Sequence, residues 1–161
     1  FMVGFANGAN LTDGLDGLAA GCAAVALGTY AVVALRTGQP ELAGLAASLA
    51  GGCLGFLWFN AYPAQVIMGD VGSQALGAAL STLAILTRRE LLLFVVGAVF
   101  VVEAASVVIQ VTYFKLTRGR RVFRSSPLHH HFELAGWEEP KIVTRFWVLA
   151  GLAALAGLVL V

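Results

Sequence analysis

The first candidate for chemistry is the segment at 10–21, NLTDGLDGLAAG, which places Asn10, Asp13 and Asp16 three residues apart. On a helical turn these side chains would share one face. Two carboxylates and an amide suit a divalent cation, or the donor groups of a sugar or a base. The alternative is an ordinary helix cap, in which Thr12 or Asp13 caps the helix that follows. A cap would explain one aspartate but not both aspartates together with Asn10.

A second candidate is the segment at 68–80, MGDVGSQALGAAL, where Asp70 lies between Gly69 and Gly72. Backbone N–H groups at a helix start can meet phosphate oxygens while a carboxylate holds Mg²⁺. The alternative is again a cap, formed by Asp70 or Ser73. The segment therefore predicts either a phosphate and metal site or only the start of a helix.

Three adjacent histidines, His129, His130 and His131, lie in the segment SPLHHHFELAGW. Adjacent residues cannot all face one way on a helix, so we do not expect a three-histidine zinc site. Imidazoles can donate hydrogen bonds to a phosphate, and this is the role we expect. An expression tag is the plain alternative, but a tag would not lie between Pro-Leu and Phe-Glu-Leu.

Glu103 and Gln110 lie seven residues apart on one face of an apolar segment. An ionisable residue inside a membrane segment faces the interior of the bundle and often marks a functional site. A structural hydrogen bond between helices is an equally weighted alternative. The basic run at 115–124 is expected to touch anionic lipid head groups, and it could also attract an anionic substrate.

The composition is typical of a membrane protein. Hydrophobic residues make up 59% of the chain and charged residues 12%, whereas a soluble domain has about 25% charged residues. The mean hydropathy is +0.86. A net charge of +1 gives no indication of nucleic-acid binding. Cys22 and Cys53 each lie in an apolar run, so we interpret both as packing residues.

Five apolar segments are long enough to cross a bilayer, which takes roughly 20 helical residues. They cover residues 18–35, 42–59, 71–87, 91–114 and 142–161. The apolar segment at 1–9 is too short to cross, and we expect it to be the end of a sixth helix. The sequence therefore predicts an all-α, polytopic membrane protein with five complete transmembrane helices, as a single transmembrane domain over residues 1–161.

Alternating these segments across the membrane brings the chemically capable loops to one side. The loops before residue 18, at 60–70 and at 115–141 then share a face that holds all three aspartates and all three histidines. The same face carries seven of the ten Lys and Arg residues, so we expect it to be cytoplasmic. We therefore predict one site at the cytoplasmic edge of the bundle.

These segments resemble the signatures of the bacterial phospho-N-acetylmuramoyl-pentapeptide transferases (translocase I). NLTDGLDGLAAG and MGDVGSQALG are shared in looser form across the polyprenyl-phosphate N-acetylhexosamine-1-phosphate transferases, whereas SPLHHHFELAGWEEPKIVTRFW is typical of the muramoyl-pentapeptide branch. The resemblance covers the whole chain. It implies transfer of phospho-MurNAc-pentapeptide from UDP-MurNAc-pentapeptide to undecaprenyl phosphate, giving lipid I and UMP. It also implies Mg²⁺ as cofactor and an active site on the cytoplasmic face of the bacterial inner membrane.

The resemblance also implies roles for individual residues. Asp70 would be the Mg²⁺ ligand. The catalytic group would comprise Asp13, Asp16, Asp70, His129, His130 and His131. The substrate-binding group would comprise Asn10, Asn60, Gly69, Ser73 and Gln110.

Two features depart from the family pattern. Ile67 stands where the family usually has a Phe that stacks on the uracil, so weaker stacking is expected. The family has ten spans, and its N-terminal half, with a paired-aspartate motif and a nearby lysine, is not matched here. We therefore expect the C-terminal part of a larger enzyme, inactive by itself, with the N-terminal half and membrane lipids as partners. The sequence is also compatible with a homodimer.

Two other functions compete with this interpretation. A sister transferase would move another UDP-N-acetylhexosamine 1-phosphate to a polyprenyl phosphate, and a donor-swap assay would separate the two. An ion-coupled transporter would use Glu103 and the aspartates as a pathway. Transporter sites lie near the membrane midplane and often between internal repeats. The cluster here lies at one edge and no repeat is found, so a transferase is favoured.

Overall fold

The protein is all-helical, as the sequence predicts. The computed structural model describes all 161 residues and contains eight helices and no strand. The helices are α1 (Met2–Thr12), α2 (Leu18–Arg36), α3 (Pro40–Asn60), α4 (Gly69–Leu86), α5 (Glu90–Val96), α6 (Ala98–Leu116), α7 (Leu128–Leu134) and α8 (Glu139–Val159). Four of them, α2, α3, α6 and α8, are long and apolar enough to cross a membrane. A polytopic membrane protein is therefore confirmed, whereas five complete spans are not.

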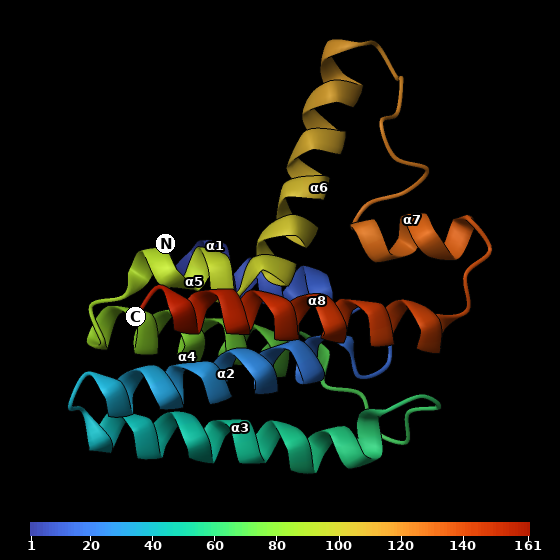
Figure 1. Cartoon of the computed structure of the whole chain (residues 1–161). Coiled ribbons are helices and arrows are strands. Elements are labelled where there is room, and N and C mark those ends of the chain that lie inside the picture. The colour runs from blue at the N-terminus through green and yellow to red at the C-terminus, as the bar shows by residue number, and fades with distance from the viewer.

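The predicted span at 91–114 is wrong as a single helix. α5 ends at Val96 and α6 begins at Ala98, with Gly97 between them at φ −94° and ψ 23°. A Cβ atom at Gly97 would lie 2.8 Å from the carbonyl oxygen of Leu93 and 3.2 Å from the ring of Phe5. Glycine therefore lets α1 approach the chain at this break. Beyond it, α6 leaves the bundle at a steep angle and α7 lies beside its lower part (Figure 1).

The predicted span at 71–87 forms α4, but this helix is not among the four that qualify by length and composition. Its amino-terminal turns carry Asp70, Ser73 and Gln74, which lower its hydropathy. α4 nevertheless lies among the long helices of the bundle (Figure 1). Its polar beginning is therefore placed at the edge of an otherwise apolar assembly.

Small residues allow the helices to pack closely, as expected for helices in lipid. A methyl group at Gly77 of α4 would overlap the backbone carbonyl of Phe5 in α1, and one at Gly21 of α2 would overlap the indole of Trp147 in α8. α2 is the most buried of the spanning helices and contacts α3, α8 and α4. The contact between α1 and α4 brings the polar segments at 10–21 and 68–80 together.

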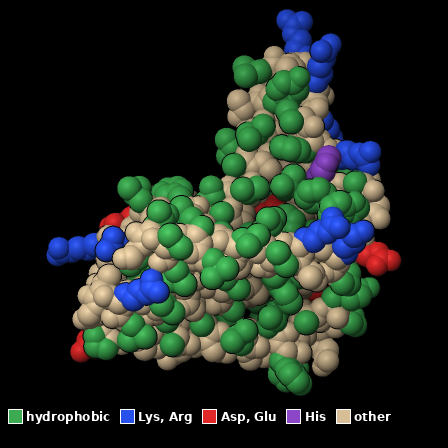
Figure 2. Space-filling model, viewed as in Figure 1, with side chains coloured by type: hydrophobic (Ala, Val, Ile, Leu, Met, Phe, Trp, Pro, Cys, Tyr) green, Lys and Arg blue, Asp and Glu red, His purple; other side chains and the backbone are tan.

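The outer surface suits a lipid environment. Apolar side chains cover the long helices, while Lys and Arg gather at the helix ends and at the far tip of α6 (Figure 2). Leu54 and Trp58 on α3 and Leu155 on α8 are among the exposed large side chains. The basic run at 115–124 therefore begins at the end of the projecting helix, and Arg124 at the end of the run returns to α7.

Candidate functional site

The end of α1 and the start of α4 meet through their polar side chains. The amide Nδ2 of Asn10 donates to Oδ1 of Asp70 and to Oγ of Ser73, each at 3.1 Å. These residues are 60 and 63 positions apart in the chain. The structure thus brings together the two segments that the sequence identifies as candidates, as the alternation of spans predicts.

The capping alternatives for these segments are wrong. Neither α2 nor α4 has a side-chain hydrogen bond at its N-cap, which is Gly17 in α2 and Met68 in α4. Thr12 instead donates to the carbonyl of Gly8, and Ser73 donates to the carbonyl of Gly69. Capping of the helix that follows each segment therefore does not account for its polar residues.

Asp13 belongs to the same cluster, because the charge of Asp70 acts on it. Burial first, and then the nearby Asp70 carboxylate, raise the pKa of Asp13 from 3.8 to about 6, while a backbone hydrogen bond from Gly69 opposes the rise. A divalent cation would relieve the repulsion between the two carboxylates, and carboxylate oxygens are suitable ligands for Mg²⁺. Asp13 and Asp70 therefore fit a hard metal ion. No third His, Cys, Asp or Glu side chain joins the two carboxylates to make a group of three such ligands.

The raised pKa of Asp13 predicts how stability depends on pH in the absence of divalent cations. The folded protein holds the proton of Asp13 more tightly than the unfolded chain does. This difference in affinity stabilises the folded protein at low pH. This stabilisation is lost as the pH rises through about 6. The unfolding temperature of the chelator-treated protein should fall over this range, and Asp13→Asn should reduce that fall. An identical pH profile in the variant would contradict the assignment.

Asp16 faces a different part of the structure from Asn10 and Asp13. The spacing of the three residues predicts that they share one helical face. This prediction is wrong, because α1 ends at Thr12. Oδ2 of Asp16 accepts a hydrogen bond from the backbone N–H of Ala64 at 2.9 Å. Its own backbone N–H donates to Oε1 of Glu139 at 2.7 Å. Asp16 therefore ties the 61–68 loop and the start of α8 to the site. The part played by Glu139 is not predicted from the sequence.

Asn60 and Gln110 direct their amides at backbone groups. Asn60 is buried, accepts from the N–H of Gly17 at 3.1 Å and donates to the carbonyl of Val66 at 2.9 Å. Gln110 accepts from the N–H groups of Val122 and Phe123 and donates to the carbonyl of Phe123. Both amides therefore hold loops in place, in contrast to the open position of Asp70.

The three histidines point in different directions. His129 is fully buried, and a methyl group at Gly14 would overlap its Nε2 atom. His130 is partly exposed and pairs with Glu133, three residues along α7. Nδ1 of His131 accepts a hydrogen bond from the backbone N–H of Arg124 at 3.1 Å. The structure thus brings His129 to the turn that contains the aspartates, while His131 holds the loop before α7.

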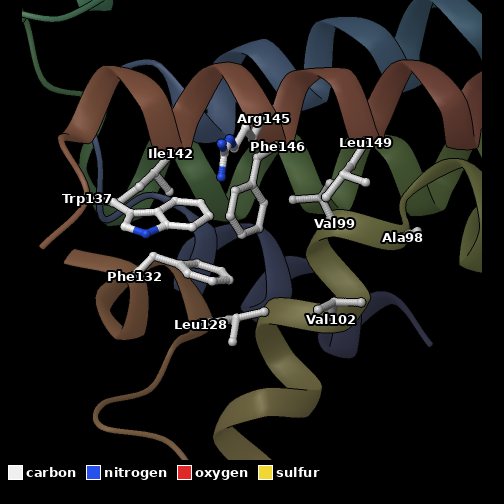
Figure 3. A pocket seen from close by; sticks show the side chains of 10 residues that line it. All are labelled: Ala98, Val99, Val102, Leu128, Phe132, Trp137, Ile142, Arg145, Phe146 and Leu149. Carbon is white, nitrogen blue, oxygen red and sulfur yellow. The ribbon is translucent and has the colours of Figure 1, made fainter. Parts of the chain in front are cut away.

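An apolar groove of about 360 Å³ lies between α6, α7 and α8. Nine of its ten lining residues are apolar, and the tenth is Arg145 (Figure 3). The guanidinium carbon of Arg145 lies 4.1 Å from the ring centre of Trp137, which stacks on Phe132. Leu128, also in the groove, is the neighbour of the buried His129. The groove and the buried His129 therefore share the helix α7.

Comparison with known proteins assigns the family. Residues 1–88, more than half of the chain, match the family model for glycosyl transferase family 4. The chain belongs to glycosyl transferase family 4. This family match includes Asn10, Asp13, Asp16 and Asp70, and it ends before Glu103 and the histidines.

Curated relatives of this family cover nearly all of the chain. It is 58% identical over 159 residues to the phospho-N-acetylmuramoyl-pentapeptide-transferase of Moorella thermoacetica, covering 99% of the chain and 50% of that protein. It is 57% identical over 157 residues to the proteins of that name in Desulforamulus reducens and Geobacillus thermodenitrificans, covering 98% of the chain and 47% and 48% of those proteins. The chain thus spans about half the length of the curated relatives that it matches.

Proposed function

We propose that the protein transfers phospho-MurNAc-pentapeptide from UDP-MurNAc-pentapeptide to undecaprenyl phosphate, giving lipid I and UMP. The observation that carries this proposal is the Asn10, Asp13 and Asp70 cluster at the edge of a membrane bundle. Relatives that are 57–58% identical bear the name of a phospho-N-acetylmuramoyl-pentapeptide-transferase. The reaction forms a phosphorus–oxygen bond to the acceptor phosphate and breaks the one to UMP, and it depends mainly on positioning and charge neutralisation.

Each residue of the cluster has a role in this proposal. Asp70, with Asp13 beside it, would hold Mg²⁺, which when bound neutralises charge on the diphosphate. Asn10 fixes one oxygen of Asp70 through its amide and leaves the rest of this exposed carboxylate open. Gly69 has φ 71°, a conformation that glycine adopts freely, and no atom lies within 4 Å of the position of its missing Cβ. A phosphate group could therefore approach the backbone there.

The membrane setting supports an acceptor with a long apolar tail. The groove beside α6 offers an apolar wall at the membrane bundle, with Arg145 as its only charged lining residue. We infer that the site faces the cytoplasm of the bacterial inner membrane, because the loops assigned to its side of the membrane carry the larger share of the Lys and Arg residues. We further infer that α4 also crosses the membrane, because it packs along α1 and α2 within the bundle.

A donor-swap assay tests the proposed function. Full-length protein in membranes or detergent is given undecaprenyl phosphate, Mg²⁺ and either UDP-MurNAc-pentapeptide or UDP-N-acetylglucosamine. Release of UMP and a lipid-linked product with the first donor alone is the expected result. Product with only the second donor would support the sister-transferase alternative. No product with either donor would overturn the proposal.

Ile67 provides a test of nucleotide binding. Its side chain is 80% exposed in the loop before α4, close in sequence to Asp70. Stacking of an aromatic ring on a base is worth about 1–3 kcal/mol, and an aliphatic side chain recovers only part of this. Ile67→Phe should therefore lower the KM for the UDP donor by about threefold or more. Val71→Phe, also exposed nearby, is the matched control, and an unchanged KM in Ile67→Phe would show that another group covers the uracil.

A further inference from the structure

A buried carboxyl and a buried imidazole meet between α6 and α7. Glu103 and His129 both have no exposed side-chain surface, and Nδ1 of His129 lies 3.2 Å from Oε2 of Glu103. This contact has an ion-pair distance but is not aligned as a hydrogen bond. The same Oε2 atom accepts a hydrogen bond at 2.7 Å from the backbone N–H of Leu128, the first residue of α7. Glu103 thus fixes both the start of α7 and one side of the imidazole.

The other side of the imidazole faces the turn that carries the aspartates. Nε2 of His129 packs so closely against Gly14 that a methyl group there would overlap it. Gly14 lies directly after Asp13 and two residues before Asp16. A continuous line of contacts therefore runs from Glu103 on α6, through His129 on α7, to the turn between α1 and α2.

A packing role alone does not account for these residue types. Three polar atoms, Oε1 of Glu103 and both ring nitrogens of His129, are buried without a hydrogen-bond partner. Well-packed apolar residues often stabilise a protein as well as or better than a buried ionic pair of similar volume. What the pair provides is a fixed arrangement, because the buried carboxyl beside Nδ1 and the close approach of Gly14 to Nε2 hold the imidazole from both sides.

We propose that Glu103 is a positioning residue for the transferase site and acts through His129. The carboxyl of Glu103 lies beside Nδ1, so that Nε2 is presented to the turn at 13–16 in one orientation. The placement of Asp13 beside Asp70 then depends on a side chain that touches neither residue. This role rests on the proposed function, because it concerns the rate of phosphoryl transfer.

The test compares Glu103→Gln, His129→Gln and the double variant in the full-length protein, using the lipid I assay with Mg²⁺. Glu103→Gln keeps an acceptor for Leu128 but loses the carboxylate that faces the imidazole. For a histidine that binds a metal, loss of the partner that orients the ring typically costs about 10–100-fold in metal affinity or activity, and we take the same scale for His129. We expect kcat to fall by this factor with both KM values changed less than about threefold, and the double variant to be no slower than His129→Gln. Glu103→Asp should retain more of the rate than Glu103→Gln.

Ser106→Ala is the matched control, because Ser106 is also buried on α6, one turn away, and donates to the carbonyl of Glu103. Its kcat should stay within about twofold of wild type. A normal kcat in Glu103→Gln would overturn the proposal. A double variant whose loss equals the product of the two single losses would also overturn it, since Glu103 would then act independently of His129.

A spectroscopic measurement separates this proposal from the proposed function. In the protein labelled with ¹⁵N-histidine, the signals of His129 are those that disappear in His129→Gln. Glu103→Gln or, if that variant does not fold, Glu103→Asp should shift the Nδ1 and Nε2 signals of His129, whereas Ser106→Ala should not. Unchanged signals would overturn the positioning role even in an active enzyme. Shifted signals in a protein that makes no lipid I would overturn only the proposed function.

Discussion

Replacing Asp70 by Asn in the full-length protein should lower the transferase rate by at least about 100-fold, the scale of losing one charge-stabilising group. Asn keeps the size of the side chain and an oxygen that can accept from Asn10, so the hydrogen bond at 3.1 Å can persist. What the substitution removes is the negative charge that a metal ion needs. The rate should therefore fall while the unfolding temperature changes little.

The measurement is the initial rate of lipid I formation over a series of Mg²⁺ concentrations. Glu41→Gln is the control, because Glu41 is an exposed carboxylate in the first turn of α3, at the other end of the bundle from Asp70. It should leave the rate within about twofold of wild type, as expected for a surface substitution. A near-normal rate and an unchanged Mg²⁺ dependence in Asp70→Asn would show that Asp70 is not the metal ligand.

The meeting of Asn10 with Asp70 could be predicted because it depends on few assumptions. Apolar segments of about 20 residues must alternate across a membrane, so the parity of the loops determines which of them share a face. α1 and α4 both have polar residues at that face. The packing of α1 against α4 then brings Asn10 within hydrogen-bond distance of Asp70 and Ser73. The prediction needed no knowledge of helix packing angles.

The break at Gly97 could not be predicted in the same way. The segment at 91–114 contains no Pro, and one Gly inside an apolar run of a membrane helix is common. The break coincides with a tertiary contact, in which the ring of Phe5 lies 3.2 Å from the position that a Cβ atom of residue 97 would take. Such a contact involves residues more than 90 positions apart and leaves no local pattern.

The separate roles of the three histidines could not be predicted from the sequence either. The sequence treats His129, His130 and His131 as one group, because their types are the same and they are adjacent. In α7, successive side chains point in different directions, so one ring is buried against Glu103, one is partly exposed and one faces the loop. Which histidine takes which role depends on where α6 lies, and the position of α6 depends on the break at Gly97.

Replacing Gly77 by Ala should both destabilise the protein and slow the reaction, although the residue lies two turns from Asp70. The new methyl group would overlap the backbone carbonyl of Phe5 and lie 2.7 Å from Cα of Ala6. Backbone atoms cannot rotate away as a side chain can, so α1 and α4 must move apart. Overpacking of this kind costs about 1–3 kcal/mol, and the unfolding temperature should fall by several degrees.

The same displacement should act on the cluster, because α1 carries Asn10 and α4 carries Asp70. A shift of about 1 Å in a catalytic group can cost about 100-fold in rate, so we expect Gly77→Ala to lose roughly 10–100-fold. Gly52→Ala is the matched control, since Gly52 is also inside a helix but has no atom within 4 Å of the added methyl group. There, Ala should leave the rate unchanged and stabilise the helix by up to about 1 kcal/mol. Equal rates in the two variants would mean that the contact between α1 and α4 does not determine the geometry of the site.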